Sequence, residues 1–382
     1  MIAYSFFTFL AALTAVYMLF LFRLRSGIRW LAGQPVEELP DAVSDAWPSV
    51  TVLLPVRNEE ANILASIASL LQQRYPADRL DVLILDDGSE DRTRDLAEEA
   101  IATQQHFRLI RGEGEGKKTM LTAGVQAARG EVIVSTDADC MHDADWLRAL
   151  VEPFLQGADI VAGPVVYQGR RSLFQRLQAL EFLGLVGVGA GFFGIGFPRL
   201  CNGANFAYRK TQFHAVGGYE GNESIQSGDD EFLLYRIVYE NGGQAHFVAR
   251  PEAVVRTAPA STIGEFLRQR IRWASKSRSC EDRRFVSFLV LLFLYFLFVA
   301  FAPLMSITSL VAMLAGLLFF VLKVIADTAV LYAAAALFRQ PLRIADVLLA
   351  EVLHAYYLVL VSLVGLFGRY TWKNRKVVTN RS

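Results

Sequence analysis

Two aspartates separated by one residue are the main chemical feature of this sequence. Asp137 and Asp139 follow an apolar run that ends at Ser135. A short turn after a buried strand can aim both carboxylates at one hard divalent cation, and that cation can bridge two phosphates of a nucleoside diphosphate. The same pattern also occurs in solvated turns and as the N-cap of a following helix. The pair is therefore a candidate metal site, and the rest of the chain must decide between these interpretations.

A second group of acids, Asp229, Asp230 and Glu231, precedes an apolar run at 232–234. Acids at a helix start are favoured by the helix dipole, which gives a purely structural interpretation. The functional interpretation makes one carboxylate a general base that takes the proton of an acceptor hydroxyl. The residues alone leave both interpretations open.

Asp86 and Asp87 end a further apolar run and are followed by Gly88. Their carboxylates can hydrogen-bond the base and ribose of a nucleotide, or they can cap the helix that begins near residue 91. Lys117 can neutralise phosphate charge, although a lysine that opens a helix is usually only solvated. Both alternatives stay open at each of these positions.

The segment 262–278 interleaves basic and apolar residues directly before a long apolar stretch. This pattern predicts an amphipathic helix on the membrane surface. A functional interpretation, compatible with the first, makes Trp273 a stacking wall for an acceptor and places Arg272 close to a diphosphate.

Apolar runs and helix-periodic segments alternate between residues 49 and 135, and they predict a doubly wound α/β sheet of parallel strands. In such sheets ligands bind at the carboxyl ends of the strands, so the acids after each strand should meet at one edge. No Gly-x-Gly-x-x-Gly turn follows the first strand, which argues against a dinucleotide-dependent oxidoreductase. The predicted strands are 49–55, 80–85, 107–111 and 131–135, and the predicted helices are 61–73, 91–103 and 117–128.

Both ends of the chain are apolar enough to enter a membrane. Residues 2–22 carry no charge and are long enough to cross the hydrocarbon core, and they lack the basic start and cleavage site of a signal peptide. Arginines follow this segment at 23, 25 and 29, and Arg283 and Arg284 precede the next apolar stretch, 285–305. Because positive flanks tend to stay in the cytoplasm, the domain between them is predicted to be cytosolic.

The C-terminal apolar region is harder to divide into spans. Residues 306–338 are too long for one ordinary span and contain Lys323 and Asp327, which are spaced to pair on one helix face. A last apolar segment, 344–367, precedes a basic tail that should lie in the cytosol. A cytosolic tail requires an even number of crossings, so either four short spans exist or one piece is re-entrant or interfacial.

Charge and cysteine content argue against two other classes of protein. Lysine plus arginine and aspartate plus glutamate number 38 each, so the chain has no basic field to attract a nucleic acid. The three cysteines, Cys140, Cys201 and Cys280, are odd in number and lack the spacing of a zinc site. A reducing compartment fits them best.

Taken in order, these residues resemble the family 2 glycosyltransferases with a GT-A fold, and the resemblance spans residues 49–273. Each motif is weak alone, and the ordered set is highly specific. The motifs are Pro55-Val-Arg-Asn-Glu59, Asp86-Asp-Gly-Ser89, Gly116-Lys117 with Leu121 to Gly124, Asp137-Ala-Asp139, Asn202-Gly-Ala-Asn205, Gly228-Asp-Asp230 and Gln269-x-x-Arg272-Trp273.

The resemblance implies a role for each motif. Mg2+ or Mn2+ and the donor diphosphate would bind at Asp137 and Asp139. Asp230 would be the catalytic base, with Asp229 beside it where many members have Glu, and the sugar would be transferred with inversion. Further donor contacts would come from Pro55, Glu59, Asp86, Asp87 and Lys117, and acceptor or diphosphate contacts would come from Gln269, Arg272, Trp273 and Asn205.

These expectations divide the chain into an N-terminal transmembrane helix (1–23), a cytosolic GT-A catalytic domain (49–260), an amphipathic interfacial helix (261–284), a C-terminal transmembrane region (285–368) and a basic cytosolic tail (369–382). The expected reaction moves a sugar from a nucleotide sugar, with UDP favoured, to a lipid or lipid-linked acceptor in a bacterial inner membrane. The arrangement also resembles processive polysaccharide synthases that act on a growing glycan. The lipid acceptor is preferred because at most five crossings leave little room for a channel. A non-catalytic membrane scaffold would require the loss of one acidic motif, and none is lost.

Overall fold

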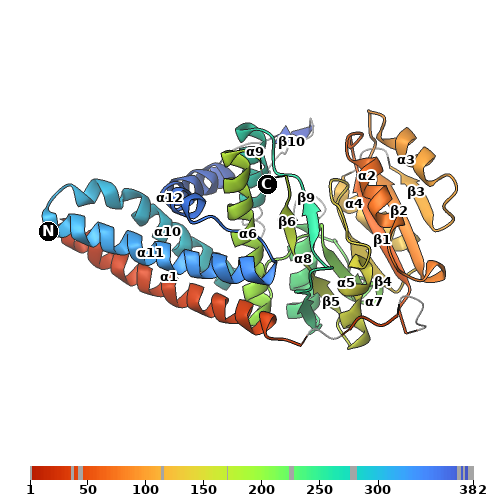
Figure 1. Ribbon diagram of the computed structural model, residues 1–382, viewed down its shortest axis with the longest axis horizontal. Helices are drawn as coiled ribbons and strands as arrows, with labels where there is room; N and C mark the ends of the chain where they lie inside the picture. The colour runs from red at the N-terminus through yellow and green to blue at the C-terminus, as the bar shows by residue number, and fades with distance from the viewer. Residues whose placement is uncertain are drawn as a thin grey trace.

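The computed structural model describes residues 2–35, 38–41, 46–112, 116–169, 171–222, 228–275, 282–367, 371–372 and 375–376. Within them, seven strands form one mixed sheet in the order β3-β2-β1-β4-β7-β5-β8, and two further strands, β6 and β9, pair separately (Figure 1). The main sheet contains β1 (Val50–Val56), β2 (Leu80–Asp86), β3 (Phe107–Arg111), β4 (Val132–Ser135), β5 (Ile160–Ala162), β7 (Phe206–Arg209) and β8 (Ala245–Phe247), and the small sheet contains β6 (Val165–Tyr167) and β9 (Val255–Thr257).

The first four strands are parallel, as the sequence predicts: β1 pairs with β2 and β4, and β2 pairs with β3. All residues of β2 are buried, which explains its continuous apolar run, because helices cover both faces of the sheet. One core contains residues of α2, α3 and α5, and the core on the other face contains residues of α4, α7 and α8. These helices are α2 (Ile63–Leu71), α3 (Thr93–Ile101), α4 (Lys117–Ala127), α5 (Trp146–Leu155), α7 (Lys210–Ala215) and α8 (Asp229–Tyr235).

The predicted α/β class is thus confirmed, with one difference in the sheet. β7 runs antiparallel to both β4 and β5, so the sheet is mixed rather than wholly parallel. The strand signal around β7 is short, and the alternation used for prediction ended at residue 135. The strand and helix bounds predicted before that point agree with the structure to within a few residues.

Five of the described helices are long and apolar enough to cross a membrane. α1, α10 and α11 extend from the α/β domain as a bundle, and α6 lies across the base of this bundle next to the sheet (Figure 1). The five helices are α1 (Ile2–Ala32), α6 (Leu173–Gly194), α10 (Arg283–Ser306), α11 (Leu310–Leu337) and α12 (Ile344–Phe367).

Two boundaries at the membrane helices differ from prediction. α1 continues to Ala32, so the arginines at 23, 25 and 29 lie within the helix instead of following it. A helix can continue past its apolar part because its backbone hydrogen bonds are internal and arginine favours helical geometry. The stretch 306–338, which looked too long for one span, is the single helix α11 after a short turn.

α6 was not predicted as a membrane-competent helix. It lies within the middle of the chain, and it contains several glycines that lower its helical signal. Those glycines allow close packing, because a side chain on Gly194 would overlap the backbone of α1 at Gly27, and one on Gly191 would lie 2.9 Å from the carbonyl oxygen of Leu24. α6 therefore joins the α/β domain to the helical bundle.

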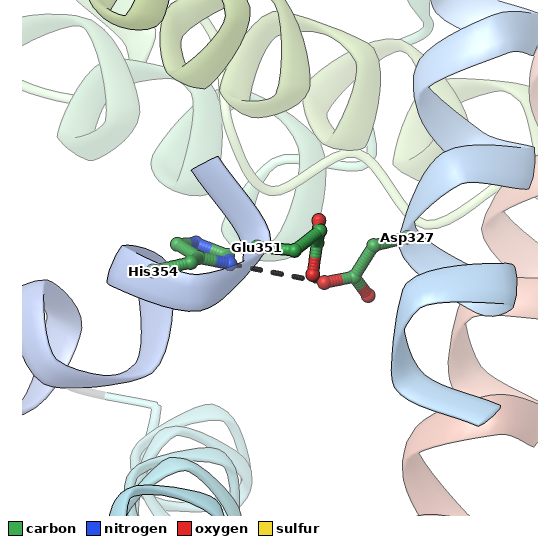
Figure 2. Close-up of side chains that lie close together, drawn as sticks. All are labelled: Asp327, Glu351 and His354. Carbon is green, nitrogen blue, oxygen red and sulfur yellow. Dashed lines mark ion pairs between the residues drawn. The ribbon is translucent and has the colours of Figure 1, made fainter. Parts of the chain in front are cut away.

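A polar cluster lies inside the helical bundle. The buried Lys323 ammonium on α11 donates to Asp327 (2.8 Å) and to Glu351 of α12, so the predicted Lys323–Asp327 pair is confirmed. The Tyr17 hydroxyl of α1 donates to Asp327 (2.6 Å), and His354 Nδ1 lies 3.7 Å from the same carboxylate (Figure 2). The cluster connects three helices.

The predicted basic tail lies largely outside the described residues. Its described part forms the two short antiparallel strands β10 (Thr371–Trp372) and β11 (Arg375–Lys376). The amphipathic helix predicted over residues 262–278 is present as α9 (Ile263–Ala274). The last residues of that predicted segment, 276–278, also lie outside the described part of the chain.

Candidate active site

The Asp137–Asp139 pair and the Asp229–Asp230 pair come together around one lysine. Asp137 follows β4, and its Oδ1 accepts a hydrogen bond from Lys117 Nζ at 2.8 Å. The same ammonium lies 3.7 Å from Asp229 Oδ2 at the start of α8. Burial lowers the pKa of Lys117, but the charges of Asp137 and Asp229 outweigh this effect and raise it. Lys117 therefore remains charged and connects two acidic motifs that are far apart in the sequence.

Asp139 occupies a part of this site that is rich in negative charge. Its Oδ2 accepts a hydrogen bond from Thr257 Oγ1 of β9 at 3.1 Å. Partial removal from bulk water, together with the charges of Asp137 and Glu59, raises the pKa of the Asp139 carboxyl. Hard oxygen ligands and an excess of negative charge are the features that a Mg2+ or Mn2+ site requires. Asp137 and Asp139 thus fit a divalent cation on the chemistry of their donor atoms.

Asp230 is buried at the first turn of α8, where its carboxylate is held by backbone groups. Oδ2 accepts a hydrogen bond from the Gly203 N–H (2.8 Å), and Oδ1 accepts one from the Glu231 N–H (2.9 Å). These bonds fix the orientation of the carboxylate next to the Asn202–Asn205 loop. The helix-dipole interpretation also holds, since three acids occupy the first turn of α8.

Asp86 and Asp87 have different surroundings. Asp86 is fully buried and accepts hydrogen bonds from Arg94 Nε (2.8 Å) and the Ser89 N–H (3.0 Å), so it holds the turn after β2. It does not cap the following helix, because the N-cap of α3 is Arg92. Asp87 Oδ1 accepts a hydrogen bond from the Gly116 N–H (2.9 Å). Asp87 therefore fixes the backbone that carries Lys117.

The Gln269-x-x-Arg272-Trp273 motif lies on α9, close to the small sheet that holds Asp139. The Tyr167 hydroxyl of β6 donates to Gln269 Oε1 at 3.3 Å, and β6 pairs with β9, which carries Thr257. Trp273 is half-buried, and its ring centroid lies 5.8 Å from that of Phe182 on α6. Arg272 is half-buried on the same helix.

The other predicted site residues divide into two groups. Pro55 and Glu59 lie at the end of β1 and are half-buried at the same sheet edge as the acids. Asn205 is fully buried and bonds Trp146 Nε1 (3.0 Å) and the carbonyl groups of Pro164 (2.8 Å) and Ala253 (2.7 Å). Because its side chain is engaged with these core groups, Asn205 holds the loop and we do not retain it as a substrate contact.

Sequence reasoning missed several residues that support the site. Thr257 bonds Asp139, and His142 bonds Thr136 Oγ1 (2.7 Å) and Ser69 Oγ (2.9 Å) just after the Asp137–Asp139 pair. Burial lowers the pKa of His142 to about 3, so this ring is neutral at physiological pH. A threonine and a single histidine carry no spacing signal, so only the fold shows these roles.

The helical bundle holds a second group of possible metal ligands. It consists of one atom each from Asp327, Glu351 and His354, and these atoms lie within 4.8 Å of one another. The Lys323 ammonium already contacts both carboxylates, so a metal ion there would have to displace a buried cation. We assign this cluster to helix packing.

Residues 51–216 match the family model "Glycosyl transferase family 2". They form a family 2 glycosyltransferase domain. Among curated proteins, the chain is 27% identical over 240 residues to "Probable glycosyltransferase YdaM" of Bacillus subtilis, covering 59% of this chain and 54% of that protein. It is 30% identical over 122 residues to "Glycosyltransferase AglE" of Haloferax volcanii, covering 31% and 40%.

A further relative of the family 2 domain is the "Poly-beta-1,6-N-acetyl-D-glucosamine synthase" of Staphylococcus aureus, which is 24% identical over 255 residues, covering 65% of this chain and 59% of that protein. The chain spans about half the length of the curated relatives it matches. A solved structure, a mannosyltransferase from Pyrobaculum calidifontis in complex with GDP-Man and Mn2+, covers 95% of this chain and 99% of its own, with a TM-score of 0.56 and 20% identity. This likeness shows the GT-A fold.

Proposed function

We propose that this chain is a membrane-bound glycosyltransferase that moves a sugar from a nucleoside diphosphate sugar to a hydroxyl group of a membrane-resident acceptor. The observation that carries the proposal is the meeting of Asp137 and Asp229 at the Lys117 ammonium, at 2.8 and 3.7 Å. Neither acidic motif is a site alone. Where the two meet, the positively charged Lys117 lies among a surplus of carboxylates.

Asp137 and Asp139 would hold a Mg2+ or Mn2+ ion, which the charge of the site and its hard oxygen ligands favour. The solved relative contains Mn2+ and GDP-mannose, which supports a divalent cation and a nucleoside diphosphate donor here. When bound, such a cation supplies charge stabilisation for a departing diphosphate. UDP remains our preferred nucleotide, and GDP is the alternative.

Asp230 would act as the catalytic base. Its carboxylate takes the proton of the acceptor hydroxyl while the acceptor oxygen forms a bond to the anomeric carbon. The bond between that carbon and the donor phosphate oxygen breaks, and the nucleoside diphosphate leaves with the electron pair. Attack opposite to the leaving group inverts the anomeric centre. Lys117 neutralises negative charge near the phosphates, and Asp229 holds its ammonium from the other side.

A lipid or lipid-linked acceptor fits the position of α9. This helix carries Gln269, Arg272 and Trp273 next to the small sheet, and it packs against the apolar helices α6 and α12. An acceptor hydroxyl anchored in the bilayer would reach the site along this boundary. A polysaccharide synthase is the second candidate, because the chain is similar to a poly-β-1,6-N-acetyl-D-glucosamine synthase.

We place the α/β domain in the cytosol, as in a bacterial inner membrane, because arginines flank it at 23, 25, 29, 283 and 284. α12 begins beside α6, where Arg176 Nε bonds Asp346 at 2.8 Å, and it ends beside α9, where Gly365 lies against Ala274. We infer from these two contacts that α12 begins and ends on the side of the α/β domain. We therefore place α10 and α11 as the two crossings after the domain and α12 as the re-entrant or interfacial piece.

The test uses membranes that contain the full chain, Mn2+ and radiolabelled UDP-glucose, UDP-N-acetylglucosamine or GDP-mannose. We expect the wild-type protein to transfer label to the membrane fraction and Asp139→Asn to lose this turnover while remaining folded. Full activity of Asp139→Asn would refute the metal-dependent site. A single added sugar on extracted lipid would support the lipid acceptor, whereas long polymers would support the synthase.

A further inference from the structure

We infer that Arg270, Glu181 and Tyr357 form a positioning bridge that sets the acceptor-facing helix α9 against the membrane helices α6 and α12. This inference rests on the proposed function, because it assigns roles at the acceptor side of the same site. The three residues lie on α9, α6 and α12 respectively. We define them together as the membrane bridge.

The bridge is built around a buried ion pair. Arg270 is only 3% exposed, although it is an arginine on a helix of otherwise amphipathic pattern. Its Nε lies 2.9 and 3.0 Å from the two carboxylate oxygens of Glu181, and its Nη2 donates to the same carboxylate. The Tyr357 hydroxyl donates to Glu181 Oε1 at 3.1 Å. A charged pair is costly to bury, so the fork geometry and the third hydrogen bond are needed to keep it.

The same guanidinium also orients two residues of the predicted acceptor motif. Arg270 Nη1 donates to Gln269 Oε1 at 2.6 Å. Its central carbon lies 4.2 Å from the centroid of the Trp273 ring, within cation–π distance. Arg270 thus contacts the first and the last residue of the Gln269–Trp273 motif while it is held by α6 and α12. Its role is to position these side chains, and it need not touch a substrate.

The bridge makes the acceptor side dependent on the membrane helices. Tyr357 also sits under α9, where the Phe266 ring stacks against it with centroids 5.5 Å apart. A shift of α12 would change the hydrogen bond to Glu181 and hence the orientation of Arg270, Gln269 and Trp273. Lys117 contacts Asp137 and Asp229, which lie on other elements than the three helices of the bridge, so we expect donor binding to be independent of the bridge.

The chain offers a matched control. A second ion pair, Arg176 with Asp346, also links α6 to α12, with bonds of 2.8 and 3.1 Å. This pair lies at the start of both helices, and in the described part of the chain its two side chains bond each other and not α9. Removing it weakens the same helix contact without disturbing the acceptor motif, so Arg176→Gln separates helix packing from positioning.

The experiment measures two products from radiolabelled UDP-glucose, UDP-N-acetylglucosamine or GDP-mannose: sugar transferred to the membrane fraction and free sugar released by hydrolysis. Their ratio is independent of the amount of folded enzyme. We expect both Tyr357→Phe and Arg270→Lys to lower the ratio of transfer to hydrolysis. For Arg270→Lys, which loses the planar fork of the guanidinium, we expect a fall of about tenfold. A tenfold fall corresponds to about 1.36 kcal/mol of lost transition-state stabilisation. The KM for the donor should stay unchanged in both variants.

Tyr357→Phe removes only a hydroxyl, so it keeps the test valid if Arg270→Lys folds poorly. Arg176→Gln should leave the ratio at the wild-type value. Two outcomes would overturn the inference: an unchanged ratio in both bridge variants, or a fall in Arg176→Gln equal to theirs. In either case, turnover by the wild-type protein would still support the proposed function. No turnover of any of the three donors by the wild-type protein would overturn the proposed function itself, and the inference with it.

Discussion

Two groups of carboxylates in this chain are each organised around one lysine, and they differ in how far the lysine is enclosed. In the bundle, Lys323 is fully buried, and its partners Asp327 and Glu351 are 7% and 4% exposed. At the sheet edge, the side chains of Lys117 and Asp137 are 28% and 37% exposed. The bundle group is closed over by three helices, whereas the sheet-edge group is open to a ligand.

The two groups also differ in charge: the bundle group is largely balanced, and the sheet-edge group has surplus negative charge. In the bundle, Lys323 contacts Asp327 and Glu351, and the Tyr17 hydroxyl and His354 also face Asp327. At the sheet edge, Lys117 faces Asp137 and Asp229, and further acids stand beside both. An enclosed and largely balanced group stabilises helix packing, whereas an open group with surplus negative charge is suited to a cation and its phosphates. Each prediction below tests this distinction.

The largest effect is expected at the catalytic base. Asp230→Asn should lower the transfer rate by about 10²- to 10⁴-fold, the usual contribution of a positioned general base. Donor affinity, measured by titration with the nucleotide sugar and Mn2+, should stay within a few-fold of wild type. A collapse of donor affinity would instead place Asp230 among the donor contacts. Asp327→Asn, from the bundle group, should retain the rate per folded molecule.

The two lysines should differ most in their effect on stability. Lys323→Met leaves two buried carboxylates without their cation and should lower the unfolding free energy by about 3–5 kcal/mol. Lys117→Met removes a partly exposed lysine and should cost little stability while it weakens donor binding. Denaturant unfolding of the detergent-solubilised proteins compares the two variants. Equal losses of stability would contradict the distinction between an enclosed group and an open one.

Mn2+ should act on the sheet-edge group alone. At a free concentration one hundred times its Kd, a ligand stabilises the native state by about 2.7 kcal/mol, which appears as a higher melting temperature. We expect this rise in wild type and in Glu351→Gln, and its loss in Asp139→Asn. The reverse pattern, with the response lost in Glu351→Gln, would make the bundle trio the metal site.

Sequence reasoning succeeded where a local pattern determines the structure. The alternation of apolar runs up to residue 135 predicted β1 to β4 and their helices, and the i, i+4 spacing predicted the Lys323–Asp327 pair. The strand-end rule also placed Glu59 and the Asp137–Asp139 pair at one edge of the sheet, and in the structure the charges of Glu59 and Asp137 act on Asp139.

The remaining features depend on contacts between distant segments. The antiparallel direction of β7 is set by pairing with β4 and β5, and the glycines of α6 acquire their meaning only against α1. Asn205 matched a motif position, yet its three bonds to core groups appear only in the fold. Arg270 has no distinguishing spacing, because its partners lie 89 residues before it at Glu181 and far after it at Tyr357.

The smallest predicted effect concerns His142, which supports the loop of the open group. Its pKa is lowered by burial to about 3 in the folded protein, whereas an unfolded histidine titrates near 6.5. Between these values the unfolded chain binds a proton that the folded chain does not, so stability falls as the pH falls below about 6.5. At pH 5 the loss should be at most about 2 kcal/mol relative to neutral pH.

Denaturant unfolding at pH 7 and pH 5 measures this difference. His142→Gln should remove most of it, and His214→Gln, at an exposed position on α7, should retain it. If the pH dependence survived in His142→Gln, the open group would owe its acid sensitivity to other residues.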